Sequence, residues 1–106
     1  MGYRSEVAVR FSEQAAEVVK IFCKLDEHIN QLVNDADTSD LPSGCLHWNY
    51  IKWYDDLEDI AAFEAMLSQL GHENYGLIRL GEDTEDIDHQ GCPWEFGMHV
   101  NRSIEW

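Results

Sequence analysis

Positive charges are scarce in this chain. Only 7 Lys and Arg residues stand against 21 Asp and Glu residues among 106, for a formal net charge of −14. Direct binding of DNA or RNA is disfavoured, because it depends on neutralising phosphates with Lys and Arg, and an anionic membrane surface is disfavoured for the same reason. The partner that fits this charge is a basic protein surface or a cation. An acidic composition that serves only solubility is the alternative.

Long hydrophobic runs and cysteines are also scarce. No apolar run approaches the ~18 residues of a transmembrane helix, and residues 1–11 lack the order of a signal peptide, so we expect a cytoplasmic protein. Cys23, Cys45 and Cys92 are odd in number and scattered, which favours reduced thiols over a disulfide framework. The length and the 44% hydrophobic content predict one domain over residues 1–106, as a monomer or homodimer.

The first third of the chain has clear hydrophobic periodicity. Residues 3–11 alternate between apolar and polar types, which predicts a strand with one buried face. Ser12 then suits a helix N-cap. From there to Val33 apolar residues recur every three or four positions, which predicts one helix of about 20 residues. The turn formers of residues 34–44 end that helix.

The rest of the chain predicts one further helix and three further strands. Residues 46–54, 75–80 and 94–101 have strand composition or alternation. The helix begins after a cap at Asp55 or Asp56 and ends at Gly71, and its apolar stripe is Ile60, Phe63, Met66, Leu67 and Leu70.

These elements predict an α+β two-layer sandwich in the order β-α-β-α-β-β. We expect about four strands in a mixed sheet, with two helices on one face and the other face largely open. The sequence leaves open whether Trp48, Trp53 and Trp106 belong to the core, to a dimer interface or to a binding surface.

Motifs for metal binding or catalysis are weak. Cys45, His47, His89 and Cys92 are the residue types of a zinc site, but Cys45 and His47 are too close in sequence for the usual ligand pair, and buried thiols with surface imidazoles are the alternative. The carboxylates of residues 82–88 do not follow the calcium-loop pattern. The sequence has no phosphate-binding glycine loop and no nucleophile elbow. We therefore expect a protein that is not an enzyme and uses no metal or cofactor.

Two acidic groups are the leading candidates for a binding surface. One group precedes and opens the second helix, and the other lies between the last two strands; they comprise Asp55, Asp56, Glu58 and Asp59, then Glu82, Asp83, Glu85, Asp86 and Asp88. If both lie at the same end of the sheet, they form one negative rim that imitates a phosphate backbone and binds a basic channel. Simple helix capping and a solvated loop are the alternative.

A second candidate surface is the open sheet face. Arg4 and Arg10 are predicted there, joined by Lys52 or Arg79 and by aromatic side chains. Arginine and aromatic groups can hold a phosphate-bearing base, so this surface suits a protein that sequesters a nucleotide signal. Pairing of these cations with carboxylates such as Glu6 is the alternative.

Four segments carry a resemblance to a known group of proteins. MGYRSEV at residues 1–7, IKWYDD at 51–56, YGLIRLGED at 75–83 and NRSIE at 101–105 make the chain similar to small proteins encoded by bacteriophages and prophages. The resemblance spans most of the chain and implies a phage accessory protein, without any catalytic residues. Together with the acidic surface, it predicts a non-catalytic inhibitor of a host nucleic-acid-handling or defence protein, such as an anti-CRISPR protein or a DNA mimic.

Overall fold

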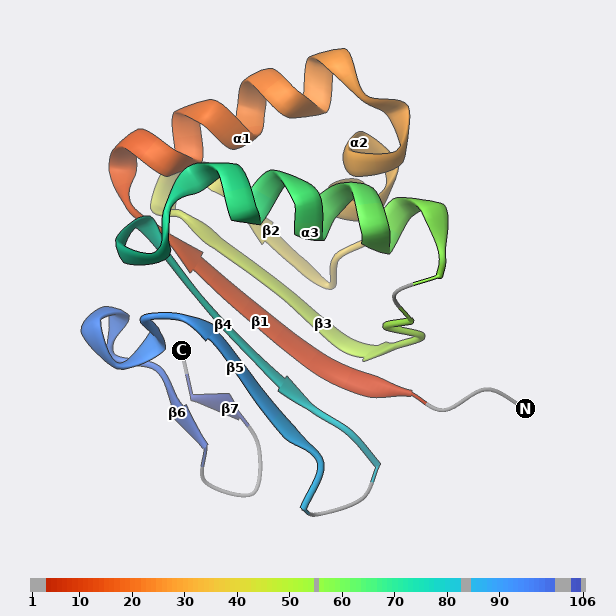
Figure 1. The fold of residues 1–106 in the computed structure, drawn as a ribbon, viewed down its shortest axis with the longest axis vertical. Helices are drawn as coiled ribbons and strands as arrows, with labels where there is room; N and C mark the ends of the chain where they lie inside the picture. The colour runs from red at the N-terminus through yellow and green to blue at the C-terminus, as the bar shows by residue number, and fades with distance from the viewer. Residues whose placement is uncertain (1–3, 55, 83–84, 101–103, 106) are drawn as a thin grey trace.

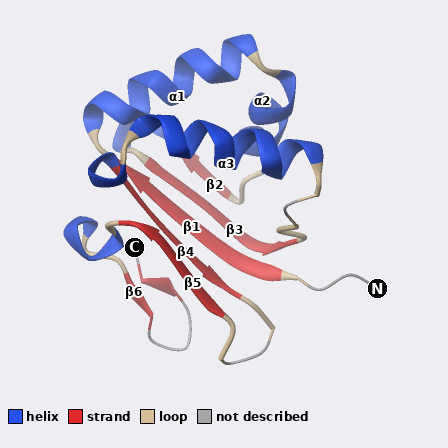
Figure 2. Cartoon of the chain, viewed as in Figure 1, coloured by secondary structure: helices blue, strands red, loops and turns tan. Residues whose placement is uncertain are grey.

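Three helices pack on one face of a five-stranded antiparallel sheet (Figures 1 and 2). The computed structural model describes residues 4–54, 56–82, 85–100 and 104–105. The elements of the main layers are β1 Ser5–Phe11, α1 Glu13–Leu25, α2 Glu27–Asn34, β2 Thr38–Asp40, β3 Cys45–Ile51, α3 Glu58–Leu70, β4 Tyr75–Leu80 and β5 Ile87–Gly91. Short 3-10 turns occur at η1 Leu41–Ser43, η2 His72–Asn74 and η3 Pro93–Phe96, and a small hairpin is formed by β6 His99–Val100 and β7 Ile104–Glu105.

The α+β class is confirmed, but the expectation of a four-stranded mixed sheet is wrong. The order is β2-β3-β1-β4-β5, and every neighbouring pair is antiparallel. α3 carries the chain from β3 to β4 across the central strand β1, so these two strands run the same way without pairing. Val7 of β1 lies opposite Trp48 on one side and Arg79 on the other, and this register fixes which side chains share a face.

The main core lies between the sheet and the helices. The alternate positions Val7, Val9 and Phe11 of β1 face it, as the sequence pattern predicts. Trp48 and Trp53 meet Phe63 of α3, with ring centroids 5.7 and 5.8 Å away and nearly perpendicular planes. Both tryptophans are buried, so they belong to the core. Trp106 lies outside the described residues.

The single long helix expected after Ser12 is divided in two. Ser12 caps α1 as predicted, and its hydroxyl accepts a hydrogen bond from the amide of Ala15. At Asp26 the backbone becomes extended, and the carboxylate accepts the amides of His28 and Ile29 to start α2. The apolar positions after the break are buried, but Leu25 before it is 80% exposed.

The expected strand over residues 94–101 is also wrong. Pro93 begins a 3-10 turn, and Gly97 has a left-handed φ of 73° that interrupts an extended chain. Strand β5 instead arises from residues 87–91, which include the end of the acidic stretch. The face of the sheet away from the helices is therefore not largely open, because Met98 and Ile104 pack there against Ala8 and Ile78. In the part of the chain that the structure describes, no helix has the length and apolar character to cross a bilayer.

Candidate functional site

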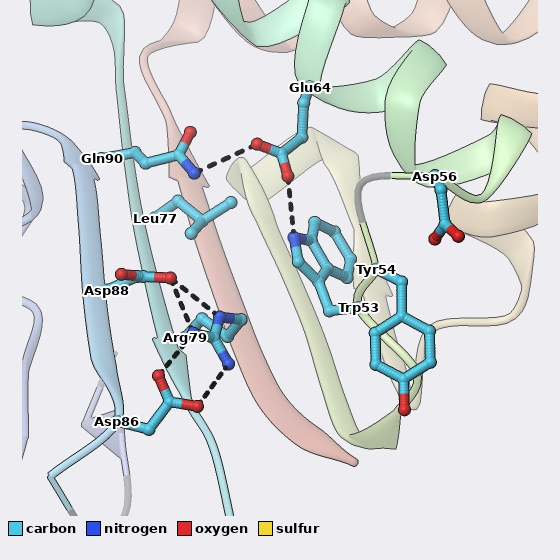
Figure 3. Close-up of a pocket in the computed structure, with 9 residues that line it drawn as sticks. All are labelled: Trp53, Tyr54, Asp56, Glu64, Leu77, Arg79, Asp86, Asp88 and Gln90. Atoms are coloured by element: carbon cyan, nitrogen blue, oxygen red, sulfur yellow. Dashed lines mark hydrogen bonds and ion pairs between the residues drawn. The ribbon is translucent and has the colours of Figure 1, made fainter. Parts of the chain in front are cut away.

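A polar pocket of about 520 Å³ opens on the helix-bearing side of the sheet (Figure 3). Because side chains alternate along a strand, Leu77 and Arg79 of β4 and Asp88 and Gln90 of β5 share this face. α3 contributes Glu64 from above. Among the described residues, the lining consists of Trp53, Tyr54, Asp56, Glu64, Leu77, Arg79, Asp86, Asp88 and Gln90.

Arg79 organises the floor of this pocket. Its Nη2 donates to Asp86 Oδ1 and to Asp88 Oδ2, both at 2.7 Å, and its Nη1 donates to the Ser5 hydroxyl at 3.1 Å. Hydrogen bonding to Asp86, with a further contribution from Asp88, raises the pKa of the Arg79 guanidinium. The guanidinium is therefore charged at every accessible pH, and its charge is directed at two carboxylates within the pocket.

Glu64 ties three separate segments together across the pocket. Its Oε1 accepts the indole N–H of Trp53 at 3.2 Å, and its Oε2 accepts the amide N–H of Gln90 at the same distance (Figure 3). The walls of the pocket are thus held in place by side chains from α3, β5 and the segment after β3. Four carboxylates and one guanidinium are present among the lining residues, so the pocket is net negative.

Residues from both predicted acidic groups meet at this pocket. Asp56, from the group before α3, lines the same hollow as Asp86 and Asp88, from the group before and within β5. Exposed Glu82 and Glu85 belong to the same β4–β5 connection. Such a meeting was the condition for a single negative rim.

The other acidic residues have different roles or lie elsewhere. Glu58 is exposed, with its carboxylate 3.3 Å from His28 Nε2, and the Asp59 carboxylate accepts the amide of Ile60. The predicted cap at Asp56 is wrong, because the N-cap of α3 is Leu57, which makes no side-chain capping bond. Asp55 and Asp83 lie outside the described residues.

The predicted cationic surface does not assemble as expected. Arg79 faces the helices, whereas Arg10 lies at an alternate position on the opposite face. Arg4 lies over the ring of Tyr50, 5.5 Å from its centroid, beside a small hollow of about 230 Å³. Lys52 is half-buried just beyond β3.

Glu6, the carboxylate considered as an alternative partner for these cations, contacts His47. Glu6 Oε2 lies 2.7 Å from His47 Nε2, and Glu6 Oε1 accepts the amide of Ile104 in β7. This interaction joins β1, β3 and the C-terminal hairpin. Of the arginines considered for the cationic surface, Arg79 thus lies on the helix-bearing face and Arg10 on the opposite face.

The four residues considered for zinc are separated by the sheet. Cys45 and His47 lie on β3, whereas His89 and Cys92 lie on or just after β5, with β1 and β4 between them. Three strand spacings amount to roughly 14 Å, which no zinc site can bridge. Over the described ranges, no three His, Cys, Asp or Glu side chains are grouped as metal ligands. The side chain of Cys92 instead lies in the interior, near the Tyr75 carbonyl.

Sequence reasoning missed Glu64, Gln90 and Tyr54 as parts of the site. Glu64 had a usable signal, because it is a charged residue within the otherwise apolar middle of α3. Comparison with models of protein families, with curated proteins and with solved structures finds no match.

Proposed function

We propose that this chain is a phage-encoded, non-catalytic inhibitor that binds a basic, nucleic-acid-binding surface of a host protein in the host cytoplasm. The observation that carries the proposal is the meeting of Asp56, Asp86 and Asp88 at one pocket with Glu64. The one cationic side chain among the nine lining residues is Arg79, whose hydrogen bonds go to Asp86, Asp88 and Ser5.

The charge arrangement suits a partner rich in Lys and Arg. Exposed Asp56 lines the pocket, and exposed Glu82 and Glu85 add negative charge to the β4–β5 connection that leads to Asp86 and Asp88. Fixed carboxylates on a folded surface attract a basic channel by the same electrostatics that draw DNA into it, and they exclude DNA while they occupy it. The resemblance to phage proteins makes a host nucleic-acid-handling or defence protein the expected target.

The second candidate, sequestration of a nucleotide signal, has one observation in its favour. Arg4 and Tyr50 form a stacked cation and aromatic pair beside the small hollow. Arg79 faces the other side of the sheet, however, and Glu82 lines the same hollow as Arg4, which disfavours an anionic ligand there. A nucleotide at 100 times its dissociation constant would stabilise the fold by about 2.7 kcal/mol. Absence of any thermal shift with cyclic and linear nucleotides would exclude this candidate.

The proposed inhibitor is tested by capture and competition. Immobilised wild-type chain is used to capture proteins from bacterial lysate, and each captured protein is purified and titrated with the chain and with duplex DNA. We expect the chain and DNA to compete for one site. A variant with Asp56→Asn, Glu82→Gln and Glu85→Gln should bind at least about tenfold more weakly, because three exposed charges that steer and hold the partner are removed.

A matched variant controls for net charge alone. Glu27→Gln, Asp35→Asn and Glu73→Gln remove three exposed acidic residues that do not line the pocket, and we expect binding close to wild type. Equal loss in both variants would show a nonspecific charge effect. Binding that neither variant alters, or that DNA does not displace, would overturn the proposal.

A further inference from the structure

Helix α1 has an exposed apolar stripe that the fold does not use. Val18 is 38% exposed, Ile21 55% and Leu25 80%. Their spacing of three and four residues places them on one side of the helix, away from buried Ala15, Ala16 and Val19. The other large exposed apolar residues of the described chain, Tyr50, Leu57, Ile87 and Trp94, lie on other segments. Figure 1 shows α1 along the outside of the helix layer, where another molecule has access.

The charge around this stripe differs from that of the whole molecule. α1 carries Glu13 and Glu17 but also Lys20 and Lys24, so its charges balance in a chain of net charge −14. Two of the three lysines of the chain are therefore on this helix. Two copies of so acidic a protein repel one another over most of their surfaces, and repulsion is least where both surfaces are neutral.

We propose that α1 is a self-association surface, on which a second copy of this chain packs its own α1 antiparallel about a two-fold axis near Ile21. The apolar stripe of each copy then packs against the same stripe of the other copy: Ile21 lies beside the partner's Ile21, and Val18 lies beside the partner's Leu25. Glu17 at the edge of the stripe comes opposite the partner's Lys24, and the two-fold axis makes this pair twice.

The geometry also limits the strength of this contact. α1 has 13 residues and is therefore about 20 Å long, and a stable interface usually takes 20–30 residues from each side. Self-association is expected to be weak and to depend on concentration. In the single chain Glu17 bonds Lys20 at 3.2 Å, and because both side chains are exposed, exchanging this bond for one to the partner changes little free energy.

Sedimentation equilibrium over a dilution series tests the proposal. We expect wild-type chain to shift from monomer to dimer as concentration rises, and Ile21→Glu to weaken the dimer at least about tenfold, because each copy loses an apolar contact and gains a facing charge. The matched control is Ala65→Glu, which places the same charge at an exposed position of α3 and should leave the dimer unchanged.

A charge exchange tests the antiparallel pairing itself. Glu17→Lys alone and Lys24→Glu alone each place like charges opposite one another twice, and we expect dissociation constants about three- to tenfold higher. The double variant restores both pairs and should return the dimer to near wild-type strength, while circular dichroism checks that every variant remains folded. A wild-type chain that stays monomeric at all concentrations, or a dimer indifferent to Ile21→Glu, overturns the proposal. A double variant no better than the single ones also overturns the antiparallel pairing.

Discussion

At the scale of single residues, Arg79 links three segments of the sheet through its side chain. It joins the C-terminal end of β4 to Ser5 on β1 and to Asp86 and Asp88 at the edge of the sheet. Only 14% of its side chain is exposed, whereas Asp86 and Asp88 are 36% and 57% exposed. The carboxylates therefore keep part of their hydration, and the guanidinium depends on them for its own hydrogen bonds.

Removing this guanidinium should weaken the fold measurably. We expect Arg79→Ala to lower the free energy of unfolding by about 1–3 kcal/mol, because two neighbouring carboxylates are left without their cation and the Ser5 hydroxyl loses a donor. The stability of Arg79→Lys should fall between those of wild type and Arg79→Ala, since one ammonium cannot reproduce the forked contacts of the guanidinium. Urea unfolding measures the effect, with exposed Lys24→Ala as the control. Equal midpoints for Arg79→Ala and Lys24→Ala would contradict this role.

The thiol of Cys92 gives the fold a dependence on alkaline pH. Burial raises the pKa of this thiol, with smaller contributions from Glu95 and Glu73. The folded chain thus holds the proton to higher pH than the unfolded chain does. This contribution to stability is complete below the pKa of the unfolded thiol, about 8.5, and is lost as pH rises toward the folded value.

We therefore expect the free energy of unfolding to fall between pH 7 and about pH 9.5. Urea unfolding at a series of pH values measures the slope, under reducing conditions. Cys92→Ala should have a lower stability at pH 7, because it loses buried contacts, but a flatter slope. Slopes that coincide in the two proteins would show that ionisation of Cys92 is not linked to folding.

At the scale of elements, the break between α1 and α2 decides which residues are buried. Asp26 ends one helix through its amide, which donates to the Phe22 carbonyl, and begins the next through its carboxylate. The change of direction buries Ile29, Leu32 and Val33 against the core and leaves Leu25 outside. The corner thus explains why Leu25, at the end of α1, is exposed although the apolar spacing continues past it.

Asp26→Ala should cost about 1 kcal/mol, the usual effect of losing an N-cap. Asn has a similar capping ability, so Asp26→Asn should stay close to wild type. Thermal and urea unfolding of the two variants measure the difference. If both variants lose the same amount, the negative charge of Asp26 matters more than its capping bonds.

Periodicity in the sequence predicts some elements of this fold and misses others for physical reasons. β1, β3 and α3 each pack an apolar face against the main core, so their alternation or helical spacing indicates them closely. β4 buries residues on both faces and is indicated instead by its run of strand-forming residues. β5 is an edge strand whose side chains are largely exposed, and backbone pairing with β4 holds it without any apolar pattern. The corner at Asp26 was missed because apolar spacing continues through it.

The candidate site was also predictable only in part. Its acidic members, such as Asp56 and Asp86, stand out as charge clusters in the sequence. Their meeting at one pocket depends on sheet order, and the orientation of Arg79 depends on register, so neither follows from composition. Arg79 was grouped with Arg10 from the sequence, and only the register shows that their strand positions point to opposite faces.

At the scale of the whole molecule, the two proposed surfaces differ in charge and in residues. No residue of α1 lines the acidic pocket, so self-association and partner binding can be altered separately. The pocket concentrates negative charge, whereas α1 is the locally neutral part of an acidic protein. Variants in one surface therefore serve as controls for the other.

The net charge of −14 should itself oppose folding. The compact state brings 21 acidic residues together with only 7 basic ones. Much of the repulsion among the carboxylates acts between side chains that are not in direct contact. Raising ionic strength from ~0.01 to ~0.1 M shortens the screening length from ~30 to ~10 Å. Screening should reduce repulsion across the molecule more than it weakens the short contacts of Arg79, which is largely buried.

We therefore expect the free energy of unfolding to rise with salt over this range, measured by urea unfolding in KCl. The Asp56→Asn, Glu82→Gln and Glu85→Gln variant should be at least as stable as wild type at low salt and should gain less from added salt, because part of the repulsion is already gone. The Glu27→Gln, Asp35→Asn and Glu73→Gln variant carries the same net charge at other positions. A smaller gain from salt in the first variant than in this control would locate the strongest repulsion at Asp56 and the β4–β5 connection. Stability that falls with salt in wild type would mean that attractive pairs dominate, contrary to this account.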